Sequence, residues 1–366
     1  MTTRSSSLPP YCPNPRCRYH TEPSRDWPWK RAGFFTRLAA PHRIQRFQCR
    51  HCRRHFSTQS FSTTYWLKRP ELLVPVLHRL LGCSGFRQIA REFDLSPQTV
   101  LGLSARLGRH CLLFHARYRP RGPILEPLAL DSFQSFEWSQ YLPTLYHLVA
   151  GRSSHFCYGF TDSECRRSGR MTAAQKRRRA ILEAGLGRPD PRSIEREVAS
   201  LLHLVAPEPQ MMELHTDEHQ DYPRALRRLR HLTIEHHTIS SRAARTSRNP
   251  LFEVNLLDLL LRHGGSHHKR ETIAFAKRRQ SAIERLAIFL VWRNWMKSFS
   301  ERRRDASPAM RLGLADHRLS AAEVLRERLV PTRVALPQRW QSYYWRRVRT
   351  RYLERPQRPH SRVFAA

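Results

Sequence analysis

Two close pairs of cysteines near the N-terminus have the spacing of metal-binding knuckles. Cys12 and Cys17 are separated by PNPR, and Cys49 and Cys52 are separated by RH. Each short loop lets two thiolates face one ion, so two such loops complete a tetrahedral site, which zinc suits best among the common metals. We therefore expect a structural Zn²⁺ site that folds residues 8–66, a segment with little core of its own.

Histidines near these pairs leave the zinc ligand set open. The first pair is more widely spaced than the commonest knuckle, and either His20 or His51 could replace one thiolate. Arginines around the second pair form a basic edge suited to phosphate contacts, and we expect DNA to be bound there by Arg50, Arg53 and Arg54. The other cysteines lack knuckle spacing and are expected to be small buried side chains: Cys83, Cys111, Cys157 and Cys165.

Acidic residues are scarce, so three acids beside apolar segments could do chemistry. Asp131 ends the apolar run PILEPLAL, Asp217 follows MMELHT, and Glu253 begins LFEVNLLDLLL. An unpaired carboxylate in such a buried setting is costly. Two strand-end aspartates and a helical glutamate can converge at one edge of a mixed sheet and hold two divalent cations, Mg²⁺ or Mn²⁺. Two such ions activate a water or 3′-hydroxyl and stabilise the leaving oxygen in phosphodiester displacement.

Each of these acids also has a structural interpretation. Asp131 could cap a turn, Asp217 could cap the next helix, and Glu253 could be a first-turn acid favoured by the helix dipole. Asp258 lies five residues beyond Glu253, roughly 140° away on a straight helix, so both cannot face the same metals. The substitutes, if one assignment is wrong, are Glu137, Glu218, Glu235 and Asp258.

A helix-turn-helix pattern follows the second cysteine pair. A first helix should end near Gly82, a second should cover FRQIAREF, and Ser96 with Pro97 should begin a third as N-cap and first-turn proline. The recognition helix of such a motif places its N-terminal residues on base edges. We expect DNA contacts from the residues off the apolar face of the third helix, namely Gln98, Thr99, Ser104 and Arg106. An ordinary helical hairpin is the alternative.

The elements that position these residues suggest several domains. β-like runs appear as ILEPLALDSFQSFE, YLPTLYHLVAG, SHFCYGFTDSE, MMELHT and LTIEHHT. Helices are expected near 192–205, over YPRALRRLRH, and from about Leu251 to Phe299 with a break at Gly264-Gly265. The expected fold is a zinc ribbon and an all-α helix-turn-helix domain, followed by an α/β core around a mixed sheet. The domain bounds are 8–66, 67–119 and 124–300, and a basic C-terminal tail covers 301–366.

The net charge of +35, from 65 Lys and Arg against 30 Asp and Glu, points to a polyanionic partner. Nucleic acid is the first candidate and an anionic membrane the competing one. A structural RNA-binding role is also open on charge alone. No stretch approaches the ~20 apolar residues that span a bilayer, and the N-terminus lacks the apolar core of a signal peptide. We therefore expect a cytoplasmic, nucleoid-associated protein that does not act at a membrane.

With these motifs in place, the sequence resembles bacterial insertion-sequence transposases that have a zinc ribbon, a helix-turn-helix and a ribonuclease-H-like catalytic core. The resemblance covers roughly residues 12–300 in short patches: CRHCRRHFS, FRQIAREFDLSPQTV, LALDSF with HTDEHQDYPRAL, and FEVNLLDLLLRHGGSHHKRETIAFAKR. The chain departs from the pattern in its wide first knuckle and in HGGSHH, which looks like an insertion. An inactive relative that only binds DNA is the alternative function.

The resemblance implies that Asp131, Asp217 and Glu253 form a catalytic triad that binds Mg²⁺. It implies that the partners are terminal inverted repeats and target DNA, and that two or more subunits act together on DNA. Further residues suited to hold the DNA backbone are Asn255, Lys269, Arg270, Lys277 and Arg278. The aromatic and basic cluster RWQSYYWRRVRTRY could stack on bases, or its aromatic side chains could pack onto the core, which we favour slightly.

Overall fold

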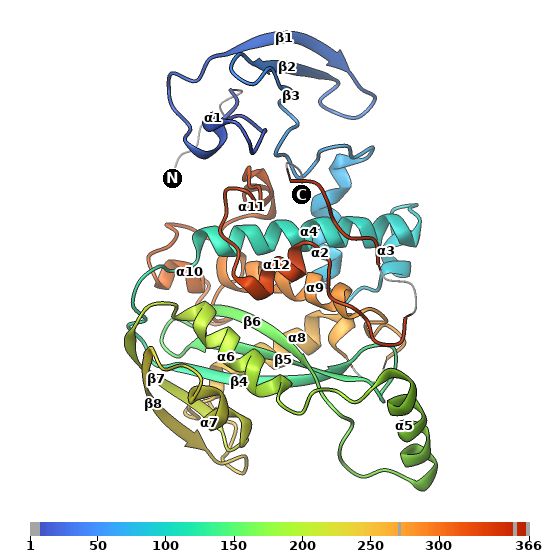
Figure 1. The fold of residues 1–366 in the computed structure, drawn as a ribbon, viewed down its shortest axis with the longest axis vertical. Coiled ribbons are helices and arrows are strands. Elements are labelled where there is room, and N and C mark those ends of the chain that lie inside the picture. Colours follow the sequence, from blue (N-terminus) through green and yellow to red (C-terminus); the bar gives the residue numbers. More distant parts are fainter. Residues whose placement is uncertain (1–7, 270–271, 354–356, 364–366) are drawn as a thin grey trace.

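The computed structural model describes residues 8–269, 272–353 and 357–363. A small N-terminal sheet lies at one end of the molecule, a helical layer lies in the middle, and a five-stranded sheet lies at the other end (Figure 1). In the described part of the chain, no helix has both the length and the apolar character needed to cross a membrane.

The N-terminal sheet has the strand order β1-β2-β3 and is antiparallel throughout. Its strands are β1 (Trp29–Thr36), β2 (Arg43–Cys49) and β3 (His55–Ser57), and a short helix, α1 (Arg18–Thr21), precedes them. This unit has its own small apolar core of aromatic side chains and cysteines, including Trp27, Phe47 and Phe56. The expected ribbon-like segment is thus a separate packing unit.

The expected trihelical pattern is confirmed in its boundaries. After the 3₁₀ turn η1 (Pro70–Leu72) come α2 (Leu73–Leu81), α3 (Phe86–Glu92) and α4 (Pro97–Tyr118). The Ser96 hydroxyl caps α4 by accepting the Thr99 N–H at 3.1 Å. At 22 residues, α4 is much longer than a recognition helix requires, and it crosses the whole helical layer (Figure 1).

The length of α4 serves packing against α9 (Arg279–Val291). A Cβ at Gly108 would lie 2.7 Å from the Cβ and the carbonyl oxygen of Glu284, so only glycine permits this approach of the two helices. One continuous hydrophobic core runs from Leu72 in η1 to Val348 near the C-terminus. The predicted division between 67–119 and 124–300 is therefore not a division between two cores.

The five-stranded sheet has the order β6-β5-β4-β7-β8. β5 pairs antiparallel with both β4 and β6, whereas β7 pairs parallel with both β4 and β8. The predicted mixed sheet is therefore present. Its strands are β4 (Leu128–Phe136), β5 (Pro143–Gly151), β6 (Cys157–Glu164), β7 (Gln210–Asp217) and β8 (Leu232–Ile239).

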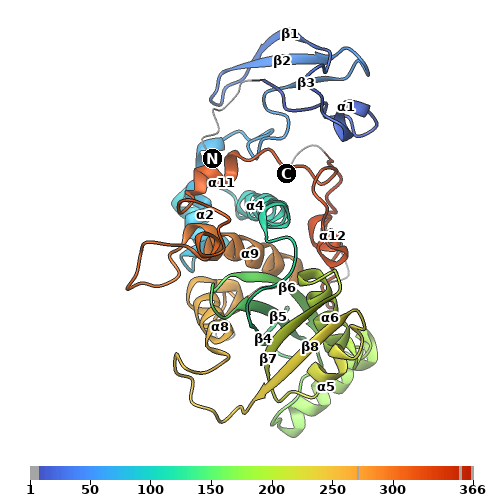
Figure 2. The same cartoon turned by 90° about the vertical axis from the view of Figure 1, so that its left-hand side faces the viewer.

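Helices cover both faces of this sheet. α6 (Ser193–Val205) packs on one face and α8 (Phe252–Gly264) on the other (Figure 2). α7 (Asp221–Leu226) connects β7 to β8 and packs against α6. α5 (Ala173–Leu186), inserted between β6 and α6, has no buried residue and projects from the body as an arm (Figure 1). As predicted, the helical stretch after β8 breaks at Gly264-Gly265.

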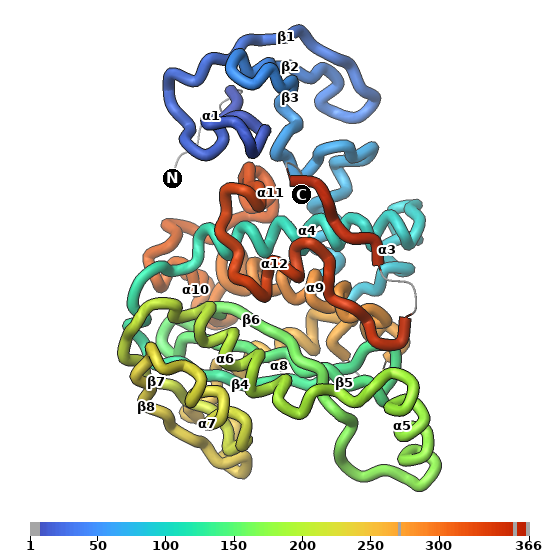
Figure 3. Tube along the Cα trace, viewed as in Figure 1, coloured from blue at the N-terminus to red at the C-terminus, as the bar shows by residue number. Residues whose placement is uncertain are grey.

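The predicted C-terminal tail is wrong, because this segment packs into the main core. It follows the 3₁₀ turn η2 (Ser266–His268) and the π-helical turn η3 (Trp292–Met296), and forms α10 (Pro308–Arg311), α11 (Ala321–Arg326) and α12 (Gln338–Tyr344). Figure 3 shows this part of the chain running along α4 and α9. Three aromatic side chains of α12 are fully buried, as the core alternative predicted: Trp340, Tyr343 and Tyr344.

Candidate functional site

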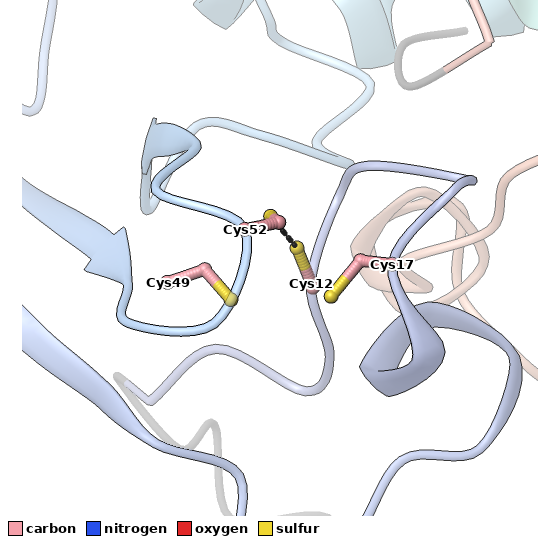
Figure 4. A group of neighbouring side chains, drawn as sticks. All are labelled: Cys12, Cys17, Cys49 and Cys52. Carbon is pink, nitrogen blue, oxygen red and sulfur yellow. Dashed lines mark hydrogen bonds between the residues drawn. The ribbon is translucent and has the colours of Figure 1, made fainter.

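The four cysteines of the two knuckles converge on one point. Their sulfur atoms all lie within 4.8 Å of one another, and Figure 4 shows the four side chains directed toward a common centre. The Sγ atoms of Cys12 and Cys52 are 3.5 Å apart, close to the ~3.8 Å edge of a tetrahedron with Zn–S bonds of about 2.3 Å. All four are free thiols, and the Trp27 indole N–H points at Cys49 Sγ from 3.3 Å. The donor set and its spacing fit Zn²⁺.

The histidine alternatives are settled by their contacts. Both ring nitrogens of His20 are engaged, one with the Cys12 carbonyl at 2.7 Å and the other with the Thr332 hydroxyl at 2.8 Å. His51 is exposed, and its Nδ1 lies 3.5 Å from Cys17 Sγ, outside the four-sulfur group. The cysteines therefore need no histidine to complete the set, while His20 ties the small sheet to the segment after α11.

A cavity of about 1130 Å³ is lined by five aspartates and Glu164. Asp190 and Asp221 form ion pairs with Arg196 and Arg224. The other three aspartates come from three different elements. Asp131 comes from β4, Asp217 from the end of β7 and Asp258 from α8. Two of these were predicted as site residues, and the third was named as a substitute. Glu253 does not line the cavity.

The sheet register brings the first two aspartates together. β4 and β7 pair in parallel at Leu128↔Leu214 and Ala129↔His215, and the ladder stops there. Continuing this register by two residues places Asp131 level with Asp217, on the same face because side chains alternate along strands. Asp131 does not end its strand as predicted, since its ladder with β5 continues. It lies instead where β4 and β7 cease to pair, which opens the cavity.

Asp258, the third aspartate, lines the cavity because it lies on the face of α8 that is turned toward it. Asn255, Asp258, Leu259 and Arg262 all line the cavity, and their spacing of three and four residues defines one helical face. Asp258 Oδ1 is buried without a hydrogen-bond partner. Burial and the charge of Asp131 raise the pKa of Asp258 well above its usual range. A buried carboxylate oxygen without a hydrogen-bond partner is typical of a cation ligand whose cation is not bound.

Asp131 is a buried carboxylate whose pKa is raised despite the positive charges near it. Burial raises its pKa to about 6, the Ser132 N–H lowers it in part, and the charge of Asp217 raises it again. The Ser132 amide donates to Asp131 Oδ1 at 2.6 Å, and the His219 amide donates to Asp217 Oδ1 at 2.9 Å. These bonds hold one oxygen of each carboxylate in place.

Glu253 lies in a different polar environment. It is buried, its Oε2 has no hydrogen-bond partner, and its electrostatic neighbours are Arg152 and Glu126 rather than the cavity aspartates. The other substitutes also lie elsewhere. Glu137 is paired with Arg351 at 2.6 Å, and neither Glu218 nor Glu235 lines the cavity.

Basic groups surround the aspartates. Arg245 and Arg262 line the cavity, and both lower the pKa of Asp258 against the effect of its burial. Sequence reasoning missed Arg245, because it lies in the loop between β8 and α8, where no motif marks it. Two further arginines reach the cavity from the base of the α5 arm, Arg166 and Arg188.

The other residues expected to hold DNA are scattered. Asn255 lines the cavity as expected, but Lys269, Lys277 and Arg278 do not. Lys277 lies over the Phe275 ring and donates to the Ile273 carbonyl at 3.0 Å. Arg270 lies outside the described residues.

The residues of α4 that were predicted to contact DNA differ in exposure. Gln98 and Thr99 are exposed, as base contacts would require. Ser104 is 0% exposed, so the prediction of a DNA contact for this residue was wrong. It faces the core because α4 is covered on more than one side. Arg106 is half-buried and donates to the Thr63 carbonyl at 2.9 Å, and its DNA contact stays a prediction. On the small sheet, Arg50, Arg53 and Arg54 are all exposed.

No protein-family model matches the sequence, and a search of curated proteins finds no match. Among solved structures, a chain of the cryo-EM structure of the simian T-cell lymphotropic virus intasome in complex with the PP2A regulatory subunit B56 gamma is similar with a TM-score of 0.24 and 14% identity. The alignment covers 60% of this chain and 66%, slightly under two thirds, of that one. A likeness at this level carries no argument about function.

Proposed function

We propose that this protein is a DNA transposase that cuts and joins DNA with two divalent cations held by Asp131, Asp217 and Asp258. One observation carries the proposal, namely that three aspartates from β4, β7 and α8 line one large cavity with arginines around it. The strand order β6-β5-β4-β7-β8, with three antiparallel strands followed by two parallel ones, supports a ribonuclease-H-like core.

The proposed third ligand is Asp258 instead of the glutamate expected from the sequence. Both acids lie on α8, but only Asp258 shares a helical face with other cavity residues. Glu253 lies nearer to Arg152, whose charge lowers its pKa against the effect of burial. Replacing each acid by its isosteric amide, in Glu253→Gln and Asp258→Asn, therefore separates the two assignments.

The aspartates fit hard divalent cations. Carboxylate oxygens are the ligands that Mg²⁺ and Mn²⁺ prefer. The three aspartates do not belong to the groups whose ligand atoms all lie within 4.8 Å of one another in the described part of the chain. Ligands spread around a pair of ions about 3.5–4 Å apart need not approach one another so closely.

When bound, the two cations would activate a water or 3′-hydroxyl and stabilise the leaving oxygen of a phosphodiester. The chain itself supplies the rest of the site. Ser132 and His219 amides hold one oxygen of Asp131 and of Asp217 in place. Arg245 and Arg262 are placed to neutralise the phosphate that enters beside these carboxylates.

The α5 arm supports DNA as the substrate. Its connecting segments line the cavity through Arg166 and Arg188, so a duplex that enters the cavity would meet the arm. The helix exposes Lys176, Arg177 and Arg178 and buries nothing. A helix of 14 residues without a buried residue gains little from packing, so its basic face is better explained by a phosphate backbone than by the fold.

The experiment is a cleavage and strand-transfer assay on duplexes that carry the sequences flanking the coding region, with Mg²⁺ or Mn²⁺. Asn at Asp131, Asp217 or Asp258 should lower the rate by about 1000-fold, which corresponds to about 4 kcal/mol. Glu253→Gln is the matched control on the same helix and should remain active. Cleavage that survives Asp131→Asn would overturn the proposal.

Two other results would revise it in defined ways. If Glu253→Gln abolishes cleavage and Asp258→Asn does not, the third ligand is the glutamate. If the unmodified protein binds its duplex ends specifically but never cuts them, the protein is a zinc-containing DNA-binding regulator. Sedimentation of the protein with and without paired ends would test the expected multimer.

A further inference from the structure

We propose that strands β7 and β8 hold a second Zn²⁺ site, formed by Glu213, His215 and His237. One ligand atom from each of these residues lies within 4.8 Å of the others. The site is distinct from the four cysteines and from the aspartate cavity, and it does not depend on the proposed function.

The strand register creates this cluster. β7 and β8 run parallel with His215 opposite His237 and Glu213 opposite Glu235. Residues two apart on a strand point to the same face, so these four side chains form a square on one face of the sheet. Because β8 is an edge strand, the square lies at the margin of the sheet, where an ion can enter.

The distances match those between ligands around one zinc ion. Glu213 Oε1 lies 2.7 Å from His215 Nε2 and 3.7 Å from His237 Nε2. Zn–N and Zn–O bonds of about 2.0–2.2 Å in a tetrahedron place neighbouring ligands roughly 3.4 Å apart. Only small side-chain rotations would therefore centre the three atoms on one ion. The two imidazole rings already lie nearly parallel, 21° apart, with centroids separated by 4.9 Å.

The hydrogen bonding of His215 is contradictory without a cation. Its Nε2 faces the Glu213 carboxylate, which only accepts, and the Arg152 Nη1, which only donates, at 2.7 Å and 3.1 Å. One ring nitrogen cannot donate to the first and accept from the second. A metal ion bound to the Nε2 lone pair and to the carboxylate satisfies both, and Arg152 can then turn toward Glu253, its electrostatic neighbour.

Burial is graded across the proposed site. The side chain of His215 is 8% exposed, whereas those of Glu213 and His237 are 36% and 40% exposed. One anchored ligand and two accessible ones give the ion a rigid base and a path from solvent. Glu235, whose Oε1 lies 3.3 Å from His237 Nε2, is a carboxylate that could supply a fourth ligand.

Two imidazoles with one or two carboxylates favour zinc among the available divalent cations, since Mg²⁺ and Ca²⁺ prefer oxygen alone. The ion would fasten the edge strand β8 to β7 two residues before Asp217. We therefore expect the site to stabilise this margin of the sheet.

The test is zinc stoichiometry by inductively coupled plasma mass spectrometry on the full-length protein after dialysis against trace Zn²⁺. The unmodified protein should hold two Zn²⁺ per chain, and His215→Ala and His237→Ala should each hold one. His236→Ala is the matched control, because His236 directly precedes His237 on β8 but points to the other face, where it contacts the Thr216 hydroxyl at 2.8 Å. This variant should retain two.

Co²⁺ substitution checks that the variants are folded and shows which ion is lost. Four thiolates give Co²⁺ an intense sulfur-to-metal charge-transfer band, which a histidine and carboxylate site lacks. The His215→Ala and His237→Ala variants should keep this band and lose only the weaker absorption of the second ion. The proposal is overturned if the unmodified protein holds a single Zn²⁺, if both variants keep two, or if His236→Ala loses the same ion.

Discussion

Two aspartates on one face of the five-stranded sheet have opposite surroundings. The register places Asp131 of β4 level with Leu148 and Phe160, and Asp162 follows Phe160 by two residues on β6. Asp162 is fully buried between guanidinium groups. It accepts from Arg339 at 2.8 Å and from the Tyr343 hydroxyl at 2.5 Å, and it forms a short ion pair with Arg279. Asp131 has no such ion pair among the described contacts.

The pKa values express this difference. Burial alone would raise the pKa of Asp162, but Arg279 and Arg339 bring it down to about 2. Burial raises the pKa of Asp131 to about 6, and only part of this effect is offset by its neighbours. A buried carboxylate that the fold itself neutralises is structural, whereas one that the fold leaves uncompensated is a candidate for binding a cation from outside.

The largest expected effect on stability is from Asp162→Asn. This change leaves Arg279 buried without its nearest carboxylate, although Glu164 retains one contact with it at 2.6 Å. We expect a loss of about 3 kcal/mol in the free energy of unfolding, measured by urea denaturation. Asp190→Asn removes an exposed partner of Arg196 and should leave the midpoint unchanged. An unchanged midpoint for Asp162→Asn would show that Asp162 is not a structural residue.

In metal-free protein, Asp131→Asn should increase the free energy of unfolding, whereas Asp162→Asn should decrease it. At pH 8 the folded chain carries a costly carboxylate at this position, and the neutral amide relieves that cost. A pKa raised from 3.8 to about 6 sets an upper limit of about 3 kcal/mol, and we expect a gain of about 1–3 kcal/mol. Denaturation in the presence of EDTA measures it. A marked loss of stability would show that Asp131 is a structural residue like Asp162.

The raised pKa of Asp131 also predicts a pH dependence of metal binding. Asp131 has a raised pKa in the folded state, so its cost is absent below pH about 4 and grows as pH rises through about 6. A divalent cation removes this cost. The rise in melting temperature on adding Mn²⁺ should therefore be present at pH 8 and lost below pH about 6. Asp131→Asn should reduce the rise at every pH, and a rise of equal size at pH 5 and pH 8 contradicts this explanation.

The smallest effect is expected from Glu253→Gln. This acid lies outside the aspartate cavity and is near Arg152, so it has neither the paired geometry of Asp162 nor the shared cavity of Asp131. Its cleavage rate should stay within about threefold of the unmodified protein, equivalent to about 0.7 kcal/mol. A loss approaching that of Asp131→Asn would move Glu253 into the metal site.

Local pattern was sufficient wherever the chemistry depends on short spacing. The cysteine knuckles, the N-cap at Ser96 and the strand around Asp131 follow from neighbouring residues, and the structure has them where they were predicted. Periodicity also located the break at Gly264-Gly265. In these cases, the residues that form each feature lie within a few positions of one another or within two short loops.

Long-range packing decided the remainder. The sequence could not indicate that Ser104 is buried, because the surface covering it comes from elsewhere in the chain. The basic segment after 301 has the composition of a solvated tail, yet α12 contributes Trp340 and Tyr343 to the core. Arginines are compatible with both outcomes, since their charge can be paired inside the protein or left in water.

By itself, the sequence predicted the four-cysteine cluster, the mixed sheet and two of the three aspartates of the proposed metal site. Only the tertiary structure favours Asp258 over Glu253 as the third proposed ligand, because the choice depends on how α8 is rotated against the sheet. Both acids lie on the same helix, and their spacing says only that one of them must face away. Packing of the apolar side of α8 against β4 and β5 fixes that rotation, and it turns Asp258 toward the cavity.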